Sequence, residues 1–153
     1  MTTHAKLEDE MNRLIFEAQK QGILLRVMGG LAVKLHSEHA AHRSLERSYP
    51  DIDFITDKVG SKKLEGFIPS MGYVSNKTFN TLNGDRRQLY YDEERNRQID
   101  IFIGEFSMCH TLPLADRLNI ETVTIPLAEL FLSKTQIVQL NRKDILDLLA
   151  LIL

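Results

Sequence analysis

The sequence predicts an α/β (α+β) domain in which a mixed sheet of about five strands is flanked by helices. Helical and strand-like segments alternate along the chain, and no internal repeat, linker or low-complexity tract separates them. The 153 residues, 43% of them hydrophobic, suit one packed core. We therefore expect a single domain over residues 1–153, whose apolar end ILDLLALIL indicates either a truncated chain or a docking helix.

The first elements follow from hydrophobic spacing and from turn residues. Residues 6–20 repeat apolar side chains at helical intervals, and Gly22 provides a C-terminal stop. Residues 23–28 form a short apolar run, which predicts a strand leading into Gly29-Gly30 and a helix over residues 31–36. Pro50 disfavours helix at the residue before it, so an extended segment should lead directly into YPDIDFI.

The middle of the chain predicts a helix and a hairpin. Residues 61–73 favour a short helix that Gly66 or Pro69 ends early. Residues 87–91 and 98–103 have strand composition and are separated by a polar connection of six residues, which favours an antiparallel hairpin.

The last third predicts one strand and two helices. Residues 120–125 alternate as a strand does, and Pro126 suits the first position of a helix over residues 127–140. A final helix is expected from about Lys143.

Composition excludes several classes of protein. The formal charge of -2 gives no overall positive field toward nucleic acid or anionic membrane, although a local basic patch stays open. The N-terminus lacks the apolar middle of a signal peptide, and no apolar run is long enough to cross a bilayer. The single cysteine, Cys109, suits a reducing compartment and is expected in the core. We expect a cytoplasmic protein without membrane contact.

Three acidic residues occupy strand-like runs where burial would be costly. Asp51 and Asp53 are two positions apart and therefore share one face of a strand, while Asp100 lies between isoleucines in QIDIFIG. Each could mark a solvated strand edge. If the two strands are neighbours, however, three carboxylates meet and supply the hard oxygen ligands that Mg²⁺ or Mn²⁺ prefers. Without the cation they should repel, so one acid takes up a proton or the site loosens.

The glycine pair offers a second element of the same site. Gly29-Gly30 ends a strand at the start of a helix, where backbone N–H groups can bind a phosphate. The alternative is that the glycines serve only a tight turn.

Together these residues resemble a known family. The glycine pair, the Asp51-Ile-Asp53 strand and a third acid with apolar neighbours are similar to the nucleotidyltransferase fold of the DNA polymerase β superfamily. The stretch GGLAVKLH followed by Arg47-x-x-x-Asp51 more closely resembles small bacterial lincosamide-type nucleotidyltransferases and the toxins of abortive-infection systems. Lys134 and the segment RKDILD at residues 142–147 resemble later elements of that branch.

The resemblance implies a function and roles for the residues. Asp51, Asp53 and Asp100 would bind Mg²⁺ or Mn²⁺ and act in catalysis, and Asp100 would accept the proton of the attacking hydroxyl. The nucleotide, with ATP among the candidates, would be bound by four residues: Gly29, Gly30, Arg47 and Lys134. A nucleoside monophosphate would pass from an NTP to a hydroxyl of a small molecule, an RNA end or a protein, and pyrophosphate would leave. Families of this kind often place acceptor-binding elements in a second domain, which this sequence does not predict.

Other interpretations compete with parts of this prediction. His36, His39 and His42 are spaced by three and could approach one side of a helix as zinc ligands, but no fourth ligand is evident. The arginines around Tyr90 and Tyr91 could contact RNA, so that a tRNA acceptor is permitted, or could belong to a solvated hairpin.

A second class of function is a non-catalytic module. By resemblance to toxin-antitoxin systems, the domain could bind a nucleotide or a protein partner, or form a homo-oligomer through its apolar C-terminal helix. The presence of all three acids favours the enzyme.

Overall fold

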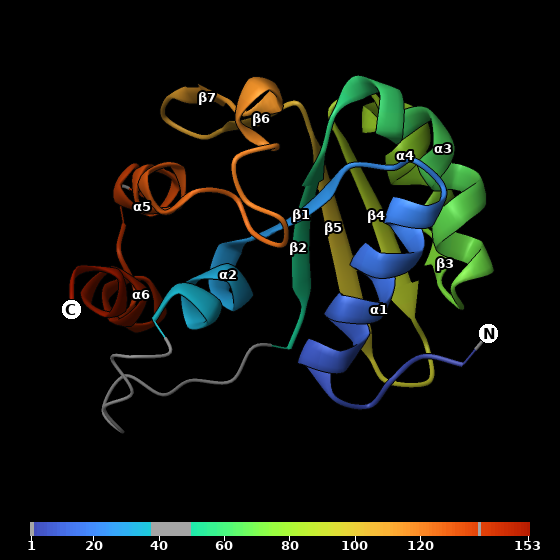
Figure 1. Ribbon diagram of the computed structural model, residues 1–153, viewed down its shortest axis with the longest axis horizontal. Coiled ribbons are helices and arrows are strands. Elements are labelled where there is room, and N and C mark those ends of the chain that lie inside the picture. Colours follow the sequence, from blue (N-terminus) through green and yellow to red (C-terminus); the bar gives the residue numbers. More distant parts are fainter. Residues whose placement is uncertain (1, 38–49, 138) are drawn as a thin grey trace.

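The computed structural model describes residues 2–37, 50–137 and 139–153 and contains a mixed five-stranded sheet (Figure 1). In spatial order the strands are β1 (Leu25–Met28), β2 (Ile52–Thr56), β5 (Arg97–Ile103), β4 (Arg87–Asp92) and β3 (Val74–Ser75). Strands β2 and β5 are parallel, and every other neighbouring pair is antiparallel. The predicted α/β class with a mixed sheet and the predicted β4–β5 hairpin are confirmed.

Helices cover this sheet from two sides. They are α1 (Leu7–Lys20), α2 (Gly29–His36), α3 (Lys58–Ser70), α4 (Lys77–Asn83), α5 (Leu127–Thr135) and α6 (Arg142–Ile152), with a 3-10 turn η3 (Ala115–Arg117). Figure 1 shows α1, α3 and α4 on the side of the molecule near the N-terminus, whereas α2, α5 and α6 gather on the other side, near the C-terminus. A small hairpin, β6 (Glu105–Ser107) and β7 (Thr111–Pro113), lies outside the main sheet.

One face of the sheet is fully apolar at its centre. Ile52 and Phe54 on β2, and Ile99 and Ile101 on β5, have no exposed surface because strand alternation turns them all to the same side. They join one core cluster with apolar residues of α1 and α3. The opposite face of the same strands carries Asp53 and Asp100, next to Ile55 and Phe102, which pack into or against the same cluster.

Helix α3 is longer than predicted because burial and capping outweigh the weak helix formers. Asp57 caps the N-terminus by accepting a hydrogen bond of 2.6 Å from the Gly60 N–H. Gly66 is on the exposed side of the helix, and Pro69 is in its last turn, so that only Ser70 follows the proline within α3. Gly66 does not end the helix, whereas α3 does end one residue after Pro69, short of residue 73 where the predicted segment ends.

The fifth strand is not the predicted one. Residues 120–125 contribute only an isolated bridge between Thr124 and Val27, because the chain makes a single approach to the β1 edge before α5 begins. The sheet is completed instead by the two-residue strand β3, which pairs with β4 and is followed by α4. Helix α5 also ends at Thr135, short of the predicted residue 140.

Composition predicted that no segment crosses a membrane and that Cys109 is in the core. Among the described residues, no helix combines the length and apolar character needed to span a bilayer. Cys109 is exposed, not in the core as expected, because the chain beyond β5 turns outward into the β6–β7 hairpin.

Candidate active site

The site begins at the junction of β1 and α2, where only glycine fits. Gly29 has a φ of +65°, and a Cβ built on it would lie 2.3 Å from Asp53 Oδ2. Met28, the residue before it, is the register partner of Asp53 across the sheet. The predicted glycine turn therefore holds the backbone directly against the Asp53 carboxylate.

The start of α2 offers backbone donors at the same place. The first N–H groups of a helix have no partner within the helix, and no side chain caps the N-terminus of α2. Gly29 and Gly30, both partly exposed, form this first turn. An anion placed beside them would meet N–H groups and the positive end of the helix.

Asp53 and Asp100 lie side by side on neighbouring strands. They are direct register partners in the parallel β2–β5 pair and therefore project from the same face. Asp53 is partly exposed, and Asp100 is 6% exposed. The predicted adjacency of the two acidic strands is confirmed.

The proximity of these acids changes the pKa of Asp53. Burial and then the negative charge of Asp100 raise the pKa of Asp53 from 3.8 to about 6, and Asp51 adds to the rise. Lys134 and Arg87 act in the opposite direction. The rise has the direction expected for a carboxylate cluster without a cation.

Asp51 lies just before β2, on the exposed side of the acidic group. It is exposed, immediately precedes β2, and its Oδ1 accepts a hydrogen bond of 2.9 Å from the Gln98 N–H in β5. This contact ties the beginning of β2 to the beginning of β5. One carboxylate thus lies outside the sheet while two lie on it.

Arg87 engages the third acid and was missed as a site residue by the sequence reasoning. Its Nε donates a hydrogen bond of 2.8 Å to Asp100 Oδ1, and its second nitrogen pairs with Asp100 Oδ2. This bond to Asp100 raises the pKa of Arg87. The available signal was the hairpin register: Arg87 and Asp100 are on the same face, with Leu89 directly opposite Asp100.

Lys134 reaches the site from α5. Its Nζ lies 2.8 Å from Asp147 Oδ2 on α6, and both side chains are largely buried. Its positive charge also lowers the pKa of Asp53, which places it within electrostatic range of the acids. The residues that resembled the later elements of the family are therefore paired with one another.

Of the three histidines and Arg47 singled out in the sequence, the structure describes only His36. Arg47, His39 and His42 lie outside the described residues. Nε2 of His36 is 3.1 Å from the Ile125 carbonyl oxygen and 2.9 Å from Thr124 Oγ1. These contacts join α2 to the segment before α5.

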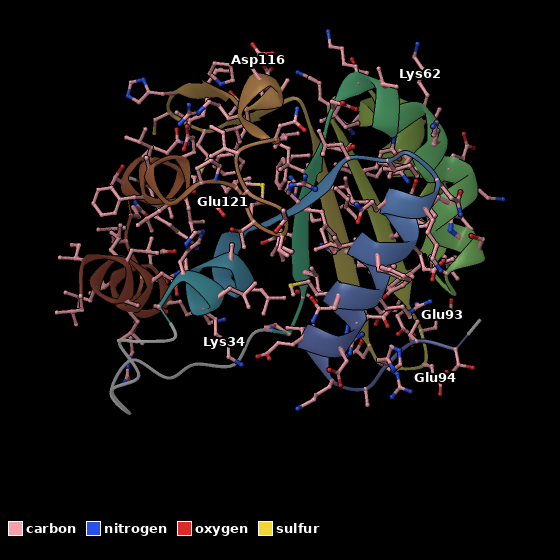
Figure 2. All side chains as sticks on the ribbon, viewed as in Figure 1. Lys34, Lys62, Glu93, Glu94, Asp116 and Glu121 are labelled. Atoms are coloured by element: carbon pink, nitrogen blue, oxygen red, sulfur yellow. The ribbon has the colours of Figure 1, made fainter. Side chains whose placement is uncertain are left out.

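The hairpin arginines have structural partners. Arg97 is 5% exposed and donates hydrogen bonds of 3.0 and 2.9 Å to the carbonyls of His4 and Ala5. Tyr90 is buried, so its ring is unable to stack on a base. Figure 2 shows Glu93 and Glu94 projecting where the hairpin turns. Of the residues considered for RNA contact, Arg97 and Tyr90 are thus not available at this hairpin.

The acids fit a hard divalent cation in chemistry, although one of them is engaged. Over residues 2–37, 50–137 and 139–153, no three His, Cys, Asp or Glu side chains are arranged as a group that could hold a metal ion. Both oxygens of Asp100 face Arg87. Burial and the negative charge of Asp100 raise the pKa of Asp53, and a cation would offset both, since carboxylate oxygens are the ligands that Mg²⁺ and Mn²⁺ prefer.

Comparison with known proteins identifies the fold. The sequence matches no protein-family model and no curated protein. A solved structure similar to this chain is the crystal structure of the lincosamide antibiotic adenylyltransferase LnuA, lincomycin-bound. The TM-score is 0.66 at 15% sequence identity, and the match covers 94% of this chain and 95% of that chain. The chain therefore has the nucleotidyltransferase fold.

Proposed function

We propose that this protein is a metal-dependent nucleotidyltransferase that transfers a nucleoside monophosphate from an NTP to a hydroxyl acceptor and releases pyrophosphate. The observation that carries the proposal is the register pairing of Asp53 with Asp100 beside Gly29 at the uncapped start of α2. In this combination, paired carboxylates lie beside the first backbone N–H groups of a helix, which supports a role in binding a phosphate and its cation. A fold shared with an adenylyltransferase agrees with this use.

Each residue has a physical role in the proposed reaction. Asp51, Asp53 and Asp100 would hold Mg²⁺ or Mn²⁺, which supplies charge compensation for the triphosphate and for the leaving pyrophosphate. The first N–H groups of α2, at Gly29 and Gly30, bind phosphate oxygens.

The remaining roles concern charge and the proton. Lys134 offsets negative charge near Asp53, and Arg47 is assigned to the nucleotide by the family resemblance alone. The acceptor oxygen forms a bond to the α-phosphorus, the bond from that phosphorus to the pyrophosphate oxygen breaks, and Asp100 accepts the hydroxyl proton. Arg87 must release Asp100 for this last role.

The acceptor is proposed from the class of the structural neighbour. That neighbour is described as a lincosamide adenylyltransferase with lincomycin bound, so a hydroxylated small molecule is the first acceptor to test. An RNA end, including that of a tRNA, and a protein hydroxyl are the other two acceptors to test. ATP is the first nucleotide to test for the same reason.

The test is nucleotide consumption by matched carboxylate variants. Purified protein with Mg²⁺ or Mn²⁺ is incubated with each labelled NTP and each acceptor class, and pyrophosphate and labelled product are measured. Asp53→Asn should reduce the rate by about a hundredfold or more, since it removes a charged group at the reacting phosphate. Asp116→Asn, at an exposed position in η3, is the control and should keep the wild-type rate. Equal rates in wild type and Asp53→Asn would contradict the proposal.

One observation favours the alternative of a partner-binding module. Ile145, Leu149 and Ile152 of α6 are 46%, 45% and 67% exposed, and their spacing aligns them along one side of the helix. Such a stripe suits a second copy of the chain or the neutralising protein of a toxin-antitoxin pair. If Leu149→Glu changes the assembly state in sedimentation while Asp53→Asn leaves every measured property unchanged, the module is the better description.

A further inference from the structure

Arg87 contacts both carboxylate oxygens of Asp100, the third acid of the site. One guanidinium nitrogen is 2.8 Å from Asp100 Oδ1 and another pairs with Asp100 Oδ2. This fork-to-fork geometry occupies both oxygens, and it is the geometry with which arginine also binds phosphate. A cation approaching Asp100 must therefore compete with Arg87.

Two aromatic rings hold the guanidinium in place. The Arg87 guanidinium carbon is 5.6 Å from the centre of the Phe79 ring on α4 and 5.1 Å from that of Phe102 on β5. Phe102 is also the register partner of Arg87 and packs edge-on against Phe106 at 5.1 Å. The two rings therefore add cation–π attraction to the position that the guanidinium occupies beside Asp100.

The burial of the pair is asymmetric. The Arg87 side chain is 42% exposed, whereas that of Asp100 is 9% exposed. The arginine is consequently reachable from solvent, while the carboxylate lies beneath it. On the same face, Asp53 is the register partner of Asp100, so Arg87 on β4 lies one strand beyond the paired acids, and a triphosphate that extends from Gly29 across them would approach it.

We propose that Arg87 blocks Asp100 in the nucleotide-free protein and moves to the triphosphate when the nucleotide binds. The proposal rests on the proposed function, because it needs a divalent cation and a nucleotide at this site. In the free protein Arg87 compensates the charge of Asp100 and lowers its affinity for a cation. When the nucleotide binds, the Arg87 guanidinium forms its two hydrogen bonds with a phosphate and no longer with Asp100, and the carboxylate becomes free.

Metal binding by the free protein tests the first half of this exchange. Binding of Mn²⁺ alone is measured by electron paramagnetic resonance for wild type, Arg87→Gln, Arg87→Lys and Arg86→Gln. Arg86 is the adjacent exposed arginine, so Arg86→Gln makes the same change in charge without touching Asp100. Arg87→Gln should bind Mn²⁺ about three- to tenfold more tightly than wild type, the range expected for losing a partly exposed ion pair.

The lysine variant separates contact from charge. Arg87→Lys keeps the positive charge but loses the fork, so its Mn²⁺ affinity should lie between those of wild type and Arg87→Gln. Arg86→Gln should stay within about twofold of wild type, because an exposed charge is screened by solvent. Thermal melts establish that each variant is folded, and Arg87→Lys carries the test if Arg87→Gln does not fold.

Nucleotide binding tests the second half. With Mn²⁺ and a non-hydrolysable ATP analogue, Arg87→Gln should weaken nucleotide binding by about tenfold, the loss of a charge-assisted phosphate contact. The proposal is overturned if neither Arg87 variant binds free Mn²⁺ more tightly than Arg86→Gln, or if Arg87→Gln binds the analogue as wild type does. Absence of NTP turnover in wild type, with both affinity changes present, would instead overturn the proposed reaction and leave the exchange intact.

Discussion

At the scale of single residues, Gly29 determines how closely the backbone approaches the acids. The positive φ excludes most side chains energetically, and the 2.3 Å separation between an added Cβ and Asp53 Oδ2 excludes them sterically. The glycine therefore serves the site through the absence of its side chain.

Replacing Gly29 should harm both stability and the site. Gly29→Ala is expected to lower the free energy of unfolding by about 1–3 kcal/mol, because the residue is strained and Asp53 must move. Gly66→Ala is the matched control: nothing lies within 4 Å of its added Cβ, and alanine in the body of α3 should stabilise by about 0.5–1 kcal/mol. Urea unfolding of the two variants measures both effects, and changes of the same sign would contradict the prediction.

The raised pKa of Asp53 makes stability depend on pH. Because the folded pKa of about 6 exceeds the ordinary value of 3.8, the native state binds more protons than the unfolded state between these pH values. Stability contributed by the protonated acid is therefore present below pH 4 and is lost as the pH rises through 6.

Asp53→Asn should remove this dependence. Relative to wild type, the variant should gain about 2 kcal/mol in free energy of unfolding between pH 4 and pH 7 in metal-free buffer. Parallel urea titrations across this range measure the difference. A difference that stays constant with pH, or that falls as the pH rises, would show that Asp53 titrates normally.

At the scale of elements, α1 is fixed by a buried carboxylate as well as by its apolar stripe. Glu10 has no exposed surface and accepts hydrogen bonds from Arg13 in the same helix, from Tyr73 before β3, and from the His4 N–H. Burial alone would raise the pKa of Glu10, but these donors lower it. The network connects α1 to the far edge of the sheet.

Glutamates on the same helix should differ strongly in their contribution. Glu10→Ala should cost about 3 kcal/mol of unfolding free energy, since it removes the buried acceptor that Arg13, Tyr73 and the His4 N–H share. Glu17→Ala, which also removes a glutamate paired three residues away with a basic residue, Lys20, should cost less than about 0.5 kcal/mol because that pair is exposed. Thermal and urea unfolding test the contrast, and comparable losses would mean that the buried network contributes little.

The elements also show where local patterns were sufficient. Helix α1 and the β4–β5 hairpin follow from spacing that the burial of one face enforces. Strand β3 has only two residues and pairs solely with β4, so no local periodicity identifies it. The 120–125 segment has strand-like alternation, but the edge of β1 accepts only one bridge from it.

At the scale of the whole molecule, the parallel pairing of β2 with β5 creates the site. These strands are separated in the chain by α3, β3, α4 and β4, yet they are neighbours at the centre of the sheet. Register then decides the chemistry, because a shift of one residue would turn Asp100 into the apolar core. The interior packing around Ile52, Phe54, Ile99 and Ile101 fixes that register.

Some site residues could be predicted from local sequence signals, and others depend on packing between distant elements. Asp51, Asp53 and Asp100 are conspicuous in sequence because charges interrupt apolar runs, and the glycine pair because it joins a strand to a helix. Arg87 is one arginine among several near the hairpin, and only its register and the two phenylalanine rings distinguish it. The pairing of Lys134 with Asp147 likewise depends on the packing of α5 against α6.

The sequence by itself determined the class of fold, the main helices, the acidic strands and the glycine junction, because each of these is governed by local spacing and by the cost of burying charge. Tertiary structure alone decided that Asp53 and Asp100 are register partners, that Arg87 covers Asp100, and which segment completes the sheet. Those outcomes depend on strand order, register and packing between distant segments, and no local pattern encodes them.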